Sequence, residues 1–396
     1  MIRTASSIRT LVQSLRAISS FSQTGVGARN SYNSGAVSSL QQVIRPSTYG
    51  EDEYADVDWD NLGFGITPAD YMYINQSTKD GEFHQGQLSR YGALELSPAA
   101  GVLNYGQGLY EGTKAYRKED GRLLVFRPDQ NALRMKMGAD RICMPCPSVD
   151  QFVDAVKQVA LANKRWVKQT PPPGKGTMYI RPLLMGSGPI MGLAPAPEYT
   201  FLIYCSPVGN YFKLGLLQEG FAPLNLYVED EFHRATRGGA GGVKSITNYA
   251  PVLKAIARAK GNGYSDVLYL DSVHKRYLEE VSSCNIFVLK GRVISTPAAI
   301  GTILQGVTRK SIIEIASDQG YQVEERAVAV DELAEADEVF CTGTAVGVAS
   351  VASITYQGKR LEYKVGAETV AQQLYSILEG IKSGAIEDKK GWVVEI

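Results

Sequence analysis

The chain has 396 residues, enough for two domains with separate cores, and its formal net charge is zero. Its hydrophobic fraction of 44% and its charged fraction of 21% are those of an ordinary globular protein, which argues against the disordered, fibrous and membrane classes. The longest apolar runs have only the length of strands, so no membrane insertion is expected.

The first 50 residues differ in charge from the rest of the chain. They hold five arginines but no lysine and no carboxylate, which leaves 36 basic and 41 acidic side chains in the remainder. Acid-free sequence rich in serine and arginine is typical of organelle transit peptides. An apolar stripe at helical spacing runs through Ile8, Leu11, Val12, Leu15 and Ile18. We therefore predict that 1–45 is a disordered, cleaved transit peptide. We expect it to direct the protein to the mitochondrial matrix, with the plastid stroma as the alternative. The mildly acidic remainder argues against a nucleic-acid partner.

In the first half of the remaining chain, strands are expected at 71–76, within 113–126, at 178–185 and at 199–205. Asp120-Gly121 predicts a hairpin turn inside the second of these segments. Ser148, with Gln151 three residues later, predicts a capping box that opens a helix.

The second half also mixes strands and helices. Strands are expected at 223–229, 266–271, 284–290, 337–341 and 350–356, and helices at 249–260, at 308–318 and near the C-terminus. Because no regular strand–helix–strand period appears, we predict a mixed α/β (α+β) protein of two domains. The boundaries are a small N-terminal domain at 46–205, an interdomain connection at 206–213 and a large C-terminal domain at 214–396.

A glycine-rich segment, GGAGGVKS at 238–245, delivers Lys244. It is not a phosphate-binding P-loop, because Val243 stands where that motif requires glycine. Taken alone, Lys244 is better explained as a solvated surface residue. The three histidines have no metal-ligand spacing, so no metal site is predicted.

Five cysteines suit a reducing compartment better than a disulfide scaffold. Cys143 and Cys146 have CxxC spacing but lack a second ligand pair for zinc. We interpret them as two thiols near a helix end, and a redox role is the less favoured alternative.

Seven segments in order resemble the plant branched-chain aminotransferases, which belong to the fold-type IV class of pyridoxal-phosphate enzymes. They are EYADVDWDNLGFG (53–65), LNYGQGLYEGTKAYR (103–117), RPLLMGSGP (181–189), GGAGGVKSITNYAPVLKA (238–255), LEEVSSCNIF (278–287), GTILQGVTRKS (301–311) and EVFCTGTAVGVAS (338–350). The resemblance covers the chain from about residue 50 to its end. It implies ping-pong transamination between Leu, Ile or Val and 2-oxoglutarate, with pyridoxal 5'-phosphate as cofactor, in a homodimer whose partner subunit contributes to the site.

The resemblance also implies which residues hold the cofactor. Lys244 would form the internal aldimine and then carry the proton. Glu280 would face the pyridine nitrogen, although alone it could equally be a solvated hairpin charge. Tyr249 would bond the ring hydroxyl, and Arg134 would hold the phosphate with its planar guanidinium. The remaining phosphate ligands would be Val307, Thr308 and Thr344, of which Thr308 stands at a predicted helix start.

For the substrate, the resemblance implies an apolar pocket walled by Tyr105, Tyr110, Tyr179 and Leu193. Arg181 would receive the distal carboxylate of glutamate, and Thr344 and Ala345 would receive the α-carboxylate together with Tyr105. Considered alone, each apolar member would be assigned to the core.

One departure and three alternatives follow from the comparison. Animal relatives carry a redox-active CxxC at the positions of Val346 and Ala349, so a thiol switch is not expected there. The alternatives of the same fold are a D-amino-acid transaminase and an aminodeoxychorismate lyase, and segment 53–65 weighs against both. The alternative from another class is a cofactor-binding protein without catalysis, and the joint presence of Lys244, Tyr249, Glu280 and Arg134 weighs against it.

Overall fold

The computed structural model describes residues 54–396 apart from 169–175 and 210–221. The predicted transit peptide lies outside the described residues. So do 210–213 of the expected interdomain connection, whereas its first residues, 206–208, still belong to a strand. In the described part of the chain, no helix is both long and apolar enough to cross a membrane.

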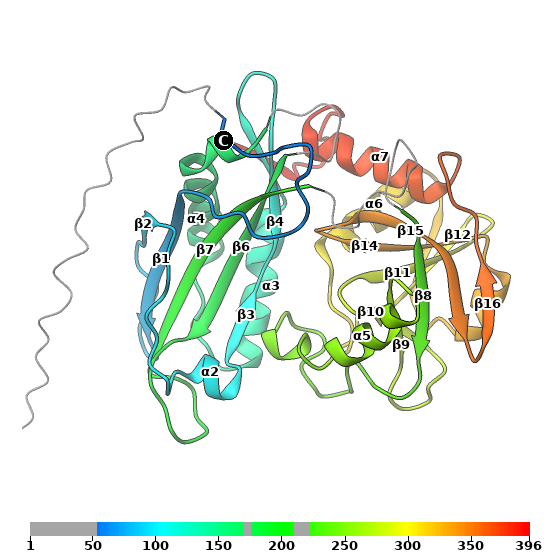
Figure 1. Cartoon of the computed structure of the whole chain (residues 1–396), viewed down its shortest axis with the longest axis horizontal. Coiled ribbons are helices and arrows are strands. Elements are labelled where there is room, and N and C mark those ends of the chain that lie inside the picture. The colour runs from blue at the N-terminus through cyan, green and yellow to red at the C-terminus, as the bar shows by residue number, and fades with distance from the viewer. Residues whose placement is uncertain (1–53, 169–175, 210–221) are drawn as a thin grey trace, which may run out of the picture. The chain divides into compact units, whose positions relative to one another are not determined.

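The first half of the chain builds an antiparallel sheet of eight strands (Figure 1). Seven of them run in the order β17-β5-β4-β6-β7-β1-β2, and β3 pairs with β6. The strands are β1 (Tyr71–Thr78), β2 (Gln87–Arg90), β3 (Gly108–Tyr110), β4 (Thr113–Arg117), β5 (Leu123–Phe126), β6 (Thr177–Gly186), β7 (Glu198–Val208) and the C-terminal β17 (Val393–Glu395). The last strand brings the end of the chain back to this sheet.

Two predictions for this sheet are confirmed. Strands β4 and β5 form the expected hairpin, with Ala115 opposite Val125, and Gly121 in the turn has a φ of 86°, which glycine adopts without strain. The helix α4 (Val149–Ala162) opens with the predicted capping box between Ser148 and Gln151. Its apolar face packs with α3 (Pro128–Arg141) on the sheet, where the core includes Phe152 and Phe201. The short helix α2 (Gly101–Tyr105) precedes β3.

The second half builds a mixed sheet of nine strands. Eight of them lie in the order β10-β9-β8-β15-β14-β11-β12-β13, and β16 pairs with β15. Parallel pairing is confined to β8 with β9, β8 with β15, and β12 with β13. The strands are β8 (Leu224–Glu229), β9 (Asp266–Leu270), β10 (Leu278–Val281), β11 (Asn285–Lys290), β12 (Val293–Pro297), β13 (Gln322–Arg326), β14 (Glu338–Gly343), β15 (Gly347–Tyr356) and β16 (Lys359–Glu362).

Three helices accompany this second sheet: α5 (Leu253–Gly261), α6 (Val307–Asp318) and α7 (Val370–Ser383). Short 3₁₀ helices occupy Lys164–Trp166, Ile246–Asn248 and Val330–Glu335. Helix α7 contacts β15 of the second sheet and also β4 and β5 of the first, so it joins the two halves (Figure 1).

The prediction that a helix begins at Tyr249 is wrong by one turn. Tyr249 follows the 3₁₀ segment, and α5 starts only at Leu253. The physical reason is Pro251, which disfavours helical backbone at Ala250 and lacks the N–H that a helix interior requires.

Candidate active site

A cavity of about 150 Å³ gathers most of the residues predicted for the site. Its lining includes Lys244, Glu280, Arg134, Val307, Thr308, Thr344, Ala345, Tyr110, Tyr179 and Arg181. These side chains come from both halves of the chain, from β3, β6 and α3 of the first and from β10, α6 and the β14–β15 turn of the second. The cavity therefore exists only where the two sheets meet.

The glycine-rich loop brings Lys244 to this cavity by allowing two loops to approach closely. A Cβ atom on Gly241 would stand 2.6 Å from the carbonyl oxygen of Thr302, and one on Gly242 would stand 2.9 Å from that of Gly301. Any larger residue at either position would push the loops apart. The glycines therefore allow the two loops to pack closely. With this packing, Lys244 lies at a cavity and is not a solvated surface residue.

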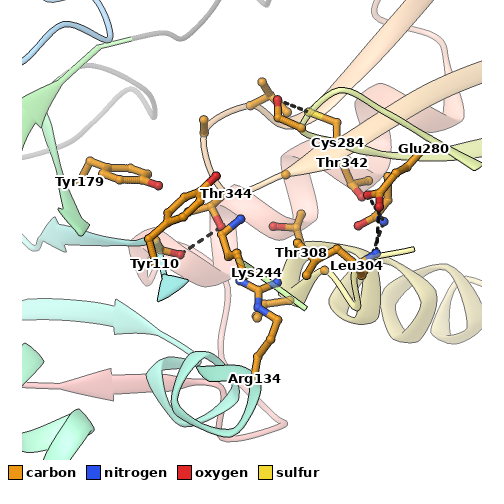
Figure 2. A pocket seen from close by; sticks show the side chains of 18 of the residues that line it. Tyr110, Arg134, Tyr179, Lys244, Glu280, Cys284, Leu304, Thr308, Thr342 and Thr344 are labelled. Atoms are coloured by element: carbon orange, nitrogen blue, oxygen red, sulfur yellow. Dashed lines mark hydrogen bonds between the residues drawn. The ribbon is translucent and has the colours of Figure 1, made fainter. Parts of the chain in front are cut away.

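The Lys244 amine lies among aromatic groups (Figure 2). Its Nζ donates to the hydroxyl of Tyr249 over 3.2 Å and lies 4.5 Å from the ring centre of Tyr110. Burial favours the neutral phenol, but the positive charge of Lys244 and a hydrogen bond from Tyr110 outweigh it and lower the pKa of Tyr249. Tyr249 does not line the cavity itself, although it contacts two residues that do.

Glu280 is buried, with 2% of its surface exposed. The alternative interpretation of Glu280 as a solvated charge on a hairpin is therefore excluded. Its carboxylate forms an ion pair of 2.6 Å with Arg234 and accepts the N–H of Leu304 over 2.9 Å. Burial raises the pKa of Glu280, while Arg234 and the Leu304 N–H oppose that shift. Arg234 is a site residue that the sequence analysis missed, because its surroundings are polar in sequence.

Arg134 lines the cavity, but its guanidinium already has a partner. Nε and one terminal nitrogen bind both oxygens of Glu111, at 2.8 and 2.6 Å, and the other terminal nitrogen donates to Gln305. Since a guanidinium has five N–H groups, two remain for a ligand. Glu111, fully buried, was also missed by the sequence analysis. A carboxylate inside an otherwise apolar strand region was the available signal.

The residues present fit pyridoxal 5'-phosphate. The free N–H groups of Arg134, the hydroxyl of Thr308 and the N-terminus of α6 suit a phosphate, because helix N-termini attract anions. The buried hydroxyl of Thr342 also lines the cavity and has no partner within the described residues, so it is available to a ligand. Lys244 provides an amine and Glu280 a carboxylate, the groups that an aldehyde and a ring nitrogen require.

The cavity wall beside Lys244 consists of aromatic side chains and one cationic side chain, that of Arg181. Tyr179 packs edge-on against Phe64, with ring centres 5.0 Å apart. Arg181 lies 4.7 Å above the ring of Tyr110 and donates to the Tyr179 hydroxyl over 3.3 Å. Its Nε has no partner in the part of the chain that the structure describes. Phe64 belongs to segment 53–65, which the sequence analysis used only for recognition.

Two predicted substrate residues lie outside the cavity. Tyr105 is 40% exposed at the end of α2, and Leu193 is 87% exposed in the loop before β7. The Tyr105 hydroxyl donates to the carbonyl of Met191, so the two segments lie side by side. Leu103 and Met191, which belong to the same two segments, are also exposed.

Cys143 and Cys146 are free, and they follow the end of α3 as expected. Burial raises the pKa of the Cys146 thiol to about 12, which keeps it protonated and unreactive. Val346 and Ala349, at the positions of the animal CxxC, are buried.

Comparison with known proteins agrees with this geometry. The family model described as amino-transferase class IV matches residues 108–354. The chain is 66% identical over 403 residues to the chloroplastic branched-chain-amino-acid aminotransferase 2 of Arabidopsis thaliana, with 100% of both chains covered. It is 63% identical over 393 residues to the mitochondrial branched-chain amino acid aminotransferase 1 of Humulus lupulus, with 98% of each covered.

Solved structures agree as well. The branched-chain aminotransferase of Thermoproteus uzoniensis, solved with norvaline, is 26% identical and gives a TM-score of 0.68, covering 82% of this chain and 99% of that one. The chain therefore belongs to the class IV aminotransferases. The family and the fold class predicted from the sequence are confirmed, and pyridoxal 5'-phosphate is the cofactor.

Proposed function

We propose that the protein transfers amino groups between branched-chain L-amino acids (Leu, Ile, Val) and 2-oxoglutarate, giving branched-chain 2-oxo acids and glutamate. The observation that supports this best is the position of the Lys244 amine, which faces an aromatic wall carrying one arginine in a cavity with anion-binding groups. The two sheets would correspond to the two domains expected from the sequence, with the cavity between them.

The bound cofactor would supply an electron sink for the pair of electrons left when the substrate α-carbon loses its proton. Lys244 would take that proton from the α-carbon and pass it to the cofactor C4′, and it would move a proton in the reverse direction in the opposite half of the cycle. Glu280, held by Arg234, would accept a hydrogen bond from the ring nitrogen and keep it protonated. Tyr249 would orient the ring hydroxyl, and Arg134, Val307, Thr308 and Thr344 would hold the phosphate.

One pocket would serve two kinds of side chain. Tyr110, Tyr179 and Phe64 offer an apolar surface, on which burial of a branched side chain is worth roughly 1.5 to 3 kcal/mol. Arg181 adds a cation with a free N–H at the same wall, which suits the distal carboxylate of glutamate. The α-carboxylate common to both substrates would bind the turn at Thr344 and Ala345.

The direct test is the formation of 4-methyl-2-oxopentanoate from leucine and 2-oxoglutarate by purified protein loaded with cofactor. We expect turnover of L-leucine and none of D-leucine or of aminodeoxychorismate. Turnover of either of these instead would favour the alternatives of the same fold. Cofactor absorbance without any turnover would favour a binding protein.

Replacing Arg181 by methionine should separate the two halves of the cycle. We expect kcat/KM for 2-oxoglutarate to fall by about 10²-fold, the usual effect of losing hydrogen bonds to a charged group. The leucine half-reaction should change by less than about threefold, since an aliphatic side chain does not need the cation. Stopped-flow spectra of each half-reaction measure both values, and equal losses in the two would contradict this role.

We also propose a homodimer in which Tyr105 and Leu193 complete the partner subunit's pocket. Both were expected to touch substrate, yet both are exposed outside the cavity of their own chain, beside exposed Leu103 and Met191. An exposed apolar surface of this kind is typical of a subunit interface.

Introducing a charge at this surface should disrupt the dimer and the activity together. We expect Leu193→Asp to sediment as a monomer at micromolar concentration and to lose at least about tenfold in leucine turnover, as hot-spot residues do. Val273→Asp places the same charge at another exposed apolar residue and is the matched control. A wild-type protein that sediments as a monomer with full activity would exclude the proposal.

For the compartment, we propose the mitochondrial matrix, with the plastid stroma as the alternative. Support comes from the arginine-bearing, acid-free first 50 residues, and the two relatives described above carry chloroplastic and mitochondrial names. Imaging these residues fused to a fluorescent reporter tests the choice.

A further inference from the structure

A group of charged side chains reaches the β14–β15 turn but does not line the active-site cavity. Lys382 and Glu379 of α7 form an ion pair of 2.8 Å, and Tyr116 of β4 donates to the second oxygen of Glu379 over 3.1 Å. Lys114, two residues before Tyr116, is the second cation. The group therefore holds two ammonium ions and one carboxylate, which leaves one positive charge.

Lys114 touches the turn directly. Its Nζ donates to the carbonyl oxygen of Ala345 over 3.2 Å. The neighbouring Thr344 hydroxyl donates to the carbonyl of Gly112 over 3.2 Å. The turn of the second sheet is therefore held at two consecutive residues by Gly112 and Lys114, at the start of β4 of the first sheet. A small cavity lined by Lys114, Lys382, Thr308 and Thr344 places both ammonium groups beside the phosphate-binding threonines.

The bond to Ala345 fixes the direction of an N–H group. A peptide bond is planar and trans, so the carbonyl of Ala345 and the N–H of Val346 point in opposite directions. Since Lys114 holds the carbonyl, the N–H is turned to the other side of the peptide. Thr344, Ala345 and Val346 all line the active-site cavity, where an anion would accept such an N–H.

From this geometry we infer that Lys114 is a positioning residue for the substrate α-carboxylate. Its ammonium group holds the 344–346 turn in its anion-binding orientation and provides positive charge behind it. The inference rests on the proposed function, and it extends that function to a residue that does not itself line the active-site cavity.

The charge of Lys114 depends on pH. Glu379 and Lys382 face it from α7, Tyr116 lies on its own strand, and Tyr179 is its partner on β6. Burial lowers the pKa of Lys114 to about 8, Glu379 opposes that shift, and Lys382 adds to it. Lys114 is therefore charged below pH 8 and loses its charge above it, so the affinity for a carboxylate should fall as the pH rises through 8.

Two variants test the role: Lys114→Met, which removes the charge, and Lys114→Arg, which keeps it at every pH. In Lys114→Met we expect KM for leucine and for 2-oxoglutarate to rise about tenfold, while kcat changes by less than about threefold, because one hydrogen bond from a charged group is lost. Lys114→Arg should restore KM to within about twofold of the wild type. A fall in kcat at unchanged KM would overturn the inference.

The decisive measurement is binding of 4-methylpentanoate, leucine without its amino group, to the cofactor-loaded enzyme by spectral titration. The carboxylate of this probe stays ionised from pH 7 to 9.5, so a change in its Kd reports titration of the loaded enzyme and not of the probe. We expect its Kd to rise above pH 8 in the wild type and to stay flat in Lys114→Arg. Coincident pH profiles would overturn the inference.

If Lys114→Met fails to fold, the comparison of the wild type with Lys114→Arg still tests the inference, because Lys114→Arg keeps the positive charge. Leucine turnover by the wild type tests the proposed function separately, so the failure of one proposal is not mistaken for the failure of the other.

Discussion

Replacing Lys244 by alanine is expected to reduce leucine turnover by about 10³-fold or more, the range assigned to a positioned acid–base group. The side chain is the amine at the centre of the cavity, 3.2 Å from the Tyr249 hydroxyl and above the ring of Tyr110. Alanine would remove the one amine that is proposed both to hold the cofactor and to move the proton. Two functions are thus lost in one substitution. The measurement is kcat under saturating cofactor, with bound cofactor determined by absorbance.

The matched control is Lys260→Ala, which removes an exposed lysine from α5, the helix that follows this segment. It should keep full activity. Borohydride reduction of the wild type followed by peptide mapping gives an independent answer, since the cofactor should be found on the peptide that contains Lys244. Attachment to another lysine, or undiminished turnover by Lys244→Ala, would refute the assignment.

Local chemistry was the part of the fold that the sequence predicted well. The hairpin at Gly121 and the capping box at Ser148 depend on residues within a few positions of one another, and both are confirmed. The start of α5 was misplaced because the prediction did not take account of Pro251, which lacks the N–H that a helix interior requires.

The site was predicted where its residues stand in recognisable motifs, and it was missed where they act through partners. Arg134 was expected to hold the phosphate, but Glu111, 23 residues earlier, takes two of its five N–H groups. Arg234 binds Glu280 across 46 residues, and Lys114 reaches Ala345 across 231. Such pairs leave no spacing pattern in the sequence, because folding alone brings them together.

Glu280 is the residue for which both kinds of information are needed. The resemblance gives it a role at the ring nitrogen, and the structure adds Arg234 at 2.6 Å as its ion-pair partner. We expect Glu280→Gln to lower kcat by about 10²-fold or more, because an amide cannot hold the ring nitrogen protonated. The variant also leaves Arg234 buried without its partner, at a cost of about 3 to 5 kcal/mol in the free energy of unfolding.

A lost activity could therefore report instability instead of chemistry, and a second variant separates the two. In Glu280→Gln combined with Arg234→Met, the buried charge is gone, so urea denaturation should show most of the stability restored. The activity should stay low, because the carboxylate is still missing. Recovery of turnover along with stability would mean that Glu280 only pairs with Arg234.

The neighbouring carboxylate gives the matched control. Glu279 is also buried in β10, but it accepts the hydroxyl of Thr302 and does not line the active-site cavity. Glu279→Gln keeps the shape of the side chain and alters no residue that lines the active-site cavity. We expect its kcat to stay within about threefold of the wild type, since no group at the reacting atoms is altered. Adjacent residues on one strand would then differ by at least an order of magnitude, because successive side chains of a strand point to opposite faces and only that of Glu280 reaches the cavity.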